Sequence, residues 1–137
     1  MTKINATKDD FARLYNGLVE VKDLKSKKFA LVAGKNMLII KDALQDVEDL
    51  NKPSEEFIEI ARKINDIANK NEANAQEQIA NIENENSEIV KARKEQLAKV
   101  TEALKQDMEL KLHMVSEDVL PEDITADQIT NIIKIIK

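Results

Sequence analysis

The sequence contains no cysteine and no tryptophan, a single histidine (His113) and only two glycines, Gly17 and Gly34. Without cysteine the chain has no disulfides and no thiol chemistry, and one histidine leaves too few ligands for a typical zinc site. Two isolated glycines do not make the glycine-rich loop that cradles phosphates. We therefore expect a protein that is not an enzyme and that carries no cofactor and no metal.

Long apolar runs are also missing. A membrane-spanning helix needs about 18 or more consecutive apolar residues, and the longest runs here, at residues 29–34 and 37–40, are far shorter. The first ten residues are polar and mixed in charge, unlike a secretory signal peptide. We expect neither membrane insertion nor secretion by a signal peptide.

Charged and helix-forming residues make up much of the chain. Of its 137 residues 42% are hydrophobic and 34% are charged, and 26 Asp and Glu against 21 Lys and Arg give a formal net charge of −5. The length suits a single domain over residues 1–137, and the composition is typical of a helical protein with a heavily solvated surface.

Residues 8–70 have the apolar spacing of a helical core. A capping threonine precedes a predicted helix over about 8–24, and apolar residues at every third or fourth position predict a second helix over about 27–50. A proline and a capping serine then introduce a third helix that ends near residue 69. We predict one further long helix over about 72–105, whose first part has only Ile79 and Ile82 as large apolar residues.

The pattern changes to period two at residues 108–115, which is typical of a strand. A strand needs a partner, so we predict a small antiparallel β-ribbon between this segment and residues 2–7. The alternative is that the long helix continues to Ser116, because Met, Leu, Glu and Lys all favour helix. Beyond Pro121, Thr125 can cap a short C-terminal helix, which completes the ribbon-bearing part of the chain over 108–137. The expected fold class is mainly α (α+β).

Gly34 lies inside the second predicted helix, where glycine costs about 1 kcal/mol relative to alanine. This indicates either a close helix crossing or a tolerated weak point. Gly34-Lys35 lacks the earlier glycine and the following Ser or Thr of a phosphate loop. We interpret Lys35 and Asn36 as a polar interruption that bonds a neighbouring backbone or a partner subunit.

Two groups of residues are candidates for cation binding. Asp42, Asp46 and Asp49 share one helical face, but no calcium loop surrounds them, so we interpret them as a solvated row. Glu109 and His113 can lie close to each other, but one histidine without further ligands is a poor metal site. We expect a surface His–Glu pair.

We expect two groups of residues to contact other proteins. Apolar positions of the long helix fit an interface, with packing inside the same chain as the alternative: Ile79, Ile82, Ile89, Leu97 and Val100. A basic corner is expected to meet an acidic surface, such as residues 117–123 of a neighbouring copy: Lys22, Lys25, Lys27 and Lys28. Nucleic acid is not the expected partner, because the chain is acidic overall and its few aromatic residues lie on apolar faces.

Both ends of the chain resemble known proteins. The matching segments are the N-terminal helix, Phe-Ala-Leu-Val-Ala-Gly-Lys-Asn at 29–36 with Leu38, Ile39 and Leu44, Glu-Leu-Lys-Leu at 109–112, and Leu120 to Gln128. Together they resemble a small, poorly characterised family of tailed-bacteriophage proteins of unknown function. The resemblance implies a phage origin and an association with virion or tail genes, and it brings no catalytic residue.

These observations lead to one expected function and one alternative. The first is a non-enzymatic phage structural or accessory protein, in the virion or the host cytoplasm, that packs against copies of itself or against other virion proteins. The alternative is an early phage protein that binds and inhibits a host enzyme or defence factor. Both would act through protein–protein contact.

Overall fold

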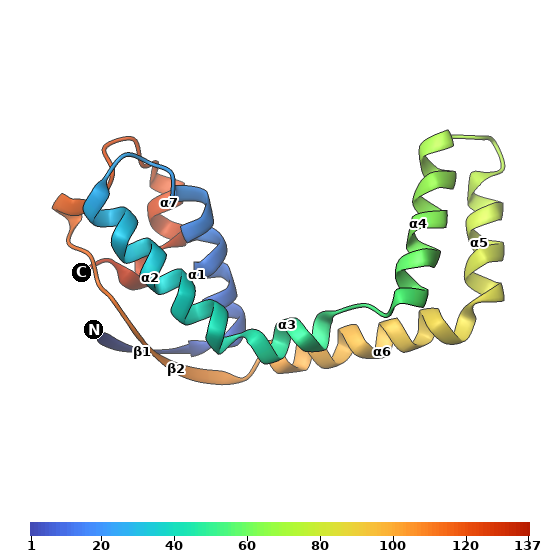
Figure 1. The fold of residues 1–137 in the computed structure, drawn as a ribbon, viewed down its shortest axis with the longest axis horizontal. Coiled ribbons are helices and arrows are strands. Elements are labelled where there is room, and N and C mark those ends of the chain that lie inside the picture. Colours follow the sequence, from blue (N-terminus) through green and yellow to red (C-terminus); the bar gives the residue numbers. More distant parts are fainter. The chain divides into compact units, whose positions relative to one another are not determined.

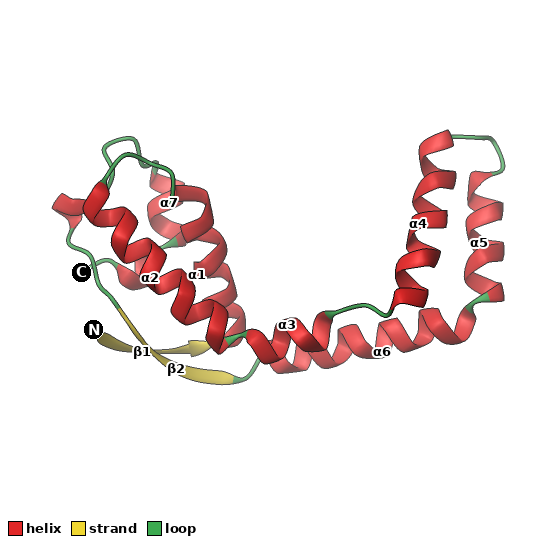
Figure 2. Cartoon of the chain, in the orientation of Figure 1, coloured by secondary structure: helices red, strands yellow, loops and turns green.

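A computed structural model describes residues 1–137 and divides them into two compact units. The terminal unit comprises Met1–Val47 and Glu102–Lys137, and the middle unit comprises Glu48–Thr101. The residues expected to form one domain are thus gathered into two units. Figures 1 and 2 show the elements in chain order: β1 (Thr2–Thr7), α1 (Lys8–Val21), α2 (Lys27–Ala43), α3 (Gln45–Asn51), α4 (Glu55–Lys70), α5 (Ala75–Glu85), α6 (Ser87–Leu104), β2 (Asp107–Leu112) and α7 (Ala126–Asn131), with 3₁₀ turns at Glu117–Val119 and Ile133–Ile135.

The predicted β-ribbon is confirmed. β1 and β2 pair antiparallel, with Thr2 opposite Leu112 and Thr7 opposite Asp107. The second strand ends at Leu112, three residues before the predicted end at Val115. The alternative of a helix that continues to Ser116 is wrong, because α6 ends at Leu104. The mainly helical fold class with a small ribbon and a short C-terminal helix is therefore confirmed.

The terminal unit has a closed apolar core. The N–H of Asp10 donates to the Thr7 hydroxyl and the Asp10 carboxylate accepts from the Thr7 N–H, which caps α1 as predicted and lowers the pKa of Asp10. The helical spacing of α1 then buries one face against α2, the ribbon and the C-terminal segment. The buried apolar residues of this core are Phe11, Leu14, Leu18, Val21, Phe29, Ala33, Ile40, Leu112, Val115, Ile132 and Ile135.

Asn36 is a fully buried polar side chain in this core. Its Nδ2 donates to the carbonyl oxygen of His113 (2.9 Å), and its Oδ1 accepts from the backbone N–H of His113 (2.8 Å). One amide side chain thus satisfies both backbone groups of the residue that follows β2, as a neighbouring strand would. This agrees with the interpretation of Asn36 as a residue that bonds a neighbouring backbone.

The segment that follows His113 is hydrogen-bonded to the C-terminal residues of the chain. Val115 forms an isolated parallel bridge with Ile136. The N–H of Val115 donates to the carbonyl of Ile135 (2.8 Å), and the N–H of Lys137 donates to the carbonyl of Val115 (2.9 Å). Thr125 caps α7 with Gln128 in the predicted capping box. The last residues of the chain are therefore part of the core and not a free tail.

Two predicted helices are each divided. The helix expected over 27–50 is interrupted at Leu44, after which Asp46 accepts from the N–H of Val47 (2.9 Å) and from Lys8 Nζ (3.1 Å). The long helix expected over 72–105 is interrupted at Asn86, whose Nδ2 donates to the carbonyl of Ile82 (2.9 Å). In both places a short polar side chain bonds near its own backbone and competes with the helical hydrogen bonds.

The close helix approach is at Gly17 and not at Gly34. A Cβ on Gly17 would lie 3.0 Å from Cβ and from the carbonyl oxygen of Asn131, and 3.2 Å from Cγ2 of Ile132. A Cβ on Gly34 would meet nothing within 4 Å. The crossing expected at Gly34 is therefore absent within this chain.

No helix is both long and apolar enough to span a membrane.

The two glycines predict opposite effects of the same substitution. Gly17→Ala should lower the free energy of unfolding by about 1–3 kcal/mol, because the new methyl group overpacks the contact with α7. Gly34→Ala should raise it by about 0.5–1 kcal/mol through helix propensity. Urea unfolding followed by circular dichroism measures both, and equal shifts in the two variants would contradict the assigned packing.

Asn36→Ala should leave the N–H and the carbonyl of His113 without their partner in the core. Each unsatisfied buried group costs about 1–3 kcal/mol, so the variant should unfold at lower urea and the His113 amide should exchange faster with solvent. Lys35→Ala changes the exposed neighbour and is the control. An unchanged exchange rate at His113 in Asn36→Ala would remove this interaction from the core.

Candidate interaction surfaces

The hairpin of α4 and α5 carries an isoleucine seam, which we define as Ile60, Ile64, Ile67, Ile79 and Ile82. The two helices contact each other and lie side by side in Figure 1. They are joined by a short loop in which Asn71 adopts a left-handed conformation (φ 50°, ψ 40°). Ile60 is buried, but the other four isoleucines remain half-buried. The seam is therefore only partly covered by the chain itself.

The middle unit as a whole has little apolar core. Its only buried hydrophobic residues are Ile60 and Val100, whereas the terminal unit buries an extensive cluster. A unit of this size gains most of its stability from apolar burial and needs a further source when burial is small. The half-buried seam is apolar surface that the middle unit leaves partly uncovered.

The structure places the five predicted interface residues in different environments. Ile79 and Ile82 belong to the seam, and Ile89 lies half-buried at the start of α6. Leu97 is 42% exposed, and Val100 is only 8% exposed. Val100 thus follows the alternative of packing inside the chain, while the other four keep surface that a partner could contact.

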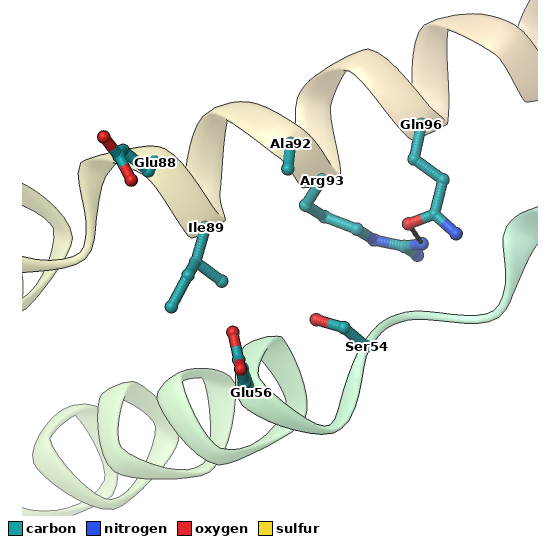
Figure 3. Close-up of a pocket in the computed structure, with 7 residues that line it drawn as sticks. All are labelled: Ser54, Glu56, Glu88, Ile89, Ala92, Arg93 and Gln96. Atoms are coloured by element: carbon teal, nitrogen blue, oxygen red, sulfur yellow. Dashed lines mark hydrogen bonds between the residues drawn. The ribbon is translucent and has the colours of Figure 1, made fainter.

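A shallow depression of about 370 Å³ lies between α4 and α6 in the middle unit (Figure 3). Ile89 and Ala92 of α6 form its apolar part, and the carboxylates of Glu56 and Glu88 lie at its rim (Figure 3). The remaining lining residues are Ser54, Arg93 and Gln96. The depression has no histidine and no nucleophile held by a neighbouring base, so it suits the docking of an apolar side chain better than a reaction.

Arg93 and Gln96 form a polar clip between α6 and the end of α3. Arg93 donates to the carbonyl of Asn51 (2.8 Å) and to Oε1 of Gln96 (2.9 Å), and Nε2 of Gln96 donates to the carbonyls of Leu50 (2.7 Å) and Lys52. These bonds satisfy carbonyls that the helix end leaves open. The guanidinium also lies 5.6 Å from the ring centre of Phe57. The clip is not predictable from the sequence, because its two members have no distinctive spacing.

The basic corner lies beside acidic residues of its own chain. Lys25, Lys27 and Lys28 share a depression of about 450 Å³ with Asp118, Glu122 and Asp123, while Lys22 is exposed outside it. The Ser26 hydroxyl donates to the carbonyl of Val119 (2.9 Å) and holds the two segments together. A hydrogen bond from Ser116, its own backbone and the charge of Lys28 lower the pKa of Asp118. The acidic residues assigned to a neighbouring copy therefore lie beside this corner within one chain.

The exposed face of α2 is a second apolar surface that the sequence did not reveal. Leu31 is 57% exposed and Leu38 is 66% exposed, although both belong to the apolar pattern of the predicted helix. The pattern of α2 is apolar around most of the helix, so periodicity alone does not show which residues face solvent. Gly34 lies between these two leucines on the same face.

The acidic candidates for chemistry are dispersed. Asp46 pairs with Lys8, whose hydrogen bond is the main cause of a lowered pKa of Asp46, and Asp49 pairs with Lys52 (3.6 Å). Glu109 lies 4.0 Å from Lys3 across the ribbon, in place of the expected pair with His113. No group of three or more His, Asp or Glu side chains is arranged to hold a metal ion.

No protein-family model, no curated protein and no solved structure matches this chain.

Removal of the polar clip should loosen the end of α3. We expect Arg93→Ala combined with Gln96→Ala to speed amide exchange in residues 48–56 and to lower the free energy of unfolding by about 0.5–1.5 kcal/mol per lost hydrogen bond. Lys94→Ala, an exposed position between the two, is the control. Exchange rates that are equal in the clip variant and the control would show that the clip does not hold this segment.

Proposed function

We propose that this chain is a non-enzymatic structural or accessory protein that acts by packing against other protein chains. The observation that carries the proposal is the isoleucine seam of the α4–α5 hairpin, which stays half-buried in a unit with only two buried hydrophobic residues. Each Å² of apolar surface that a partner removes from water contributes about 25 cal/mol of favourable hydrophobic free energy. The partner would complete a core that the chain begins.

The form of the hairpin supports this role. Two amphipathic helices lie side by side in the hairpin, and the apolar face of amphipathic helices commonly binds a helix of another protein. The exposed acidic and basic residues of α4 and α5 surround the apolar seam, as polar rims surround the core of an interface. The depression beside Ile89 extends the apolar surface along α6.

The assembly in which this packing takes place is a proposal from the sequence resemblance. The resemblance to tailed-phage proteins makes the virion or its tail the first assembly to examine. The alternative, an early protein that binds a host enzyme or defence factor, would use the same seam. Particle composition separates the two, because only a virion component is retained in purified particles.

The seam and the adjoining Ile89 are tested with Ile82→Asp combined with Ile89→Asp, in the tailed phage that the resemblance predicts as the source of the chain. We expect the wild-type chain in gradient-purified particles at a fixed stoichiometry by mass spectrometry, and the variant to be lost from them with its helical circular dichroism signal intact. A buried carboxylate without a partner is strongly disfavoured, which is why the contact should fail.

Asn81→Asp combined with Asn84→Asp is the control, since it adds the same charge at exposed positions of α5, the helix that carries Ile82. Retention of the Ile82/Ile89 variant in particles would remove the seam from the contact surface. Absence of the wild-type chain from particles, together with expression early in infection, would overturn the virion role in favour of the host-directed alternative.

A further inference from the structure

We propose that the exposed face of α2 is a docking site for the acidic α4–α5 hairpin of a second copy of this chain, so that copies join head to tail. This inference rests on the proposed function, because the hairpin is the partner surface in both. We define the α2 face as Lys27, Leu31, Gly34, Lys35 and Leu38.

The apolar part of the α2 face is unusually open. Leu31 and Leu38 are separated by two helical turns and are 57% and 66% exposed. Between them a Cβ on Gly34 would meet nothing within 4 Å. The two leucines therefore flank a hollow over bare backbone, where the side chains of a crossing helix fit closely.

Gly34 has no function within the chain that the structure shows. Glycine inside an exposed helix is unfavourable relative to alanine, and no neighbouring element of this chain approaches it. Gly17, in contrast, is required by the close contact with Asn131. Close approach of a second chain would give Gly34 the role that Gly17 has within the first.

The lysines around the α2 face favour a partner with acidic residues. α2 carries Lys27, Lys28, Lys35 and Lys41 and the single acid Asp42, and none of these lysines forms an ion pair within 4 Å. Lys27 and Lys28 share a depression with acidic residues of their own chain, whereas Lys35 and Lys41 lie outside it. A partner helix with acidic residues around an apolar stripe would be attracted and oriented by these charges.

The hairpin of the same chain has that chemistry. Residues 71–90 contain no Lys and no Arg, and they contain five glutamates, Glu72, Glu77, Glu83, Glu85 and Glu88. Three of these are exposed on α5, whose half-buried Ile79 and Ile82 supply the apolar stripe. A second copy therefore offers acidic residues that complement the lysines of the α2 face and apolar side chains that can cover its two leucines.

The contact uses two different surfaces, one in the terminal unit and one in the middle unit. Such a heterologous contact leaves one free α2 face and one free hairpin after each addition, so it continues into a ring or a filament. A contact of hairpin with hairpin would instead close as a dimer. The two arrangements are distinguished by mixing variants.

Gly34→Leu is the first test, measured by sedimentation velocity over a range of concentrations. Filling the hollow should weaken association by about tenfold or more, while the circular dichroism spectrum stays helical and thermal stability does not fall. Ala98→Leu adds similar bulk at an exposed position of α6, outside both proposed surfaces, and should associate like the wild type. Wild-type association that is unaffected by Gly34→Leu would overturn the proposal, and so would a wild-type chain that stays monomeric at every concentration.

Mixing two defective variants is the second test. Leu31→Glu with Leu38→Glu destroys the α2 face, and Glu83→Lys with Glu85→Lys reverses two of the exposed acidic charges of α5. Each variant alone should be monomeric, and an equal mixture should form a heterodimer and no larger species, because only one intact pair of surfaces remains. Self-association of the Leu31/Leu38 variant would show a hairpin-to-hairpin contact and overturn the proposal.

The outcomes also separate this proposal from the proposed function. A monomeric wild-type chain whose incorporation into particles still depends on Ile82 and Ile89 would overturn head-to-tail docking and leave the function of the seam standing. Association that persists in the Ile82→Asp, Ile89→Asp variant would exclude the hairpin as the contact between copies and would overturn head-to-tail docking, whereas retention of the same variant in particles would contradict the proposed function.

Discussion

The bidentate contact between the Asn36 side chain and the backbone of His113 joins the two halves of the terminal unit. Asn36 comes from the middle of α2, and His113 follows the strand that returns from the far part of the sequence. A buried amide is costly unless all its bonds are made, so this contact favours one register of α2 against the ribbon over its alternatives. The apolar core packs around it, and the C-terminal residues then close over Val115.

The two units use apolar residues in different ways. The terminal unit buries Phe11, Phe29 and their neighbours completely, and its remaining apolar exposure is concentrated at Leu31 and Leu38. The middle unit distributes its isoleucines over a two-helix seam and orders the end of α3 with the polar clip of Arg93 and Gln96. A two-helix hairpin cannot surround its own apolar side chains, which is the physical reason for proposing that a partner covers them.

Several elements followed directly from local patterns in the sequence. The alternation around Leu110 predicted the strand and its pairing with residues 2–7, and the capping boxes at Thr7 and Thr125 predicted two helix starts. The helix breaks at Leu44 and Asn86 were missed, because a polar side chain can either face solvent or bond its own backbone, and the choice depends on neighbours such as Lys8 that are distant in sequence. Likewise, composition does not show which of two helical glycines meets another element.

The element types and most of their order can be predicted from the sequence, since apolar period and capping chemistry are local properties. The sequence also indicated that Ile79 and Ile82 would lie on one face of a helix. Only the tertiary structure decided that Gly17 and not Gly34 is at a crossing, that the basic corner lies beside acids of its own chain, and that Leu31 and Leu38 remain exposed. These are properties of which surfaces meet, and the meeting depends on contacts between residues far apart in the chain.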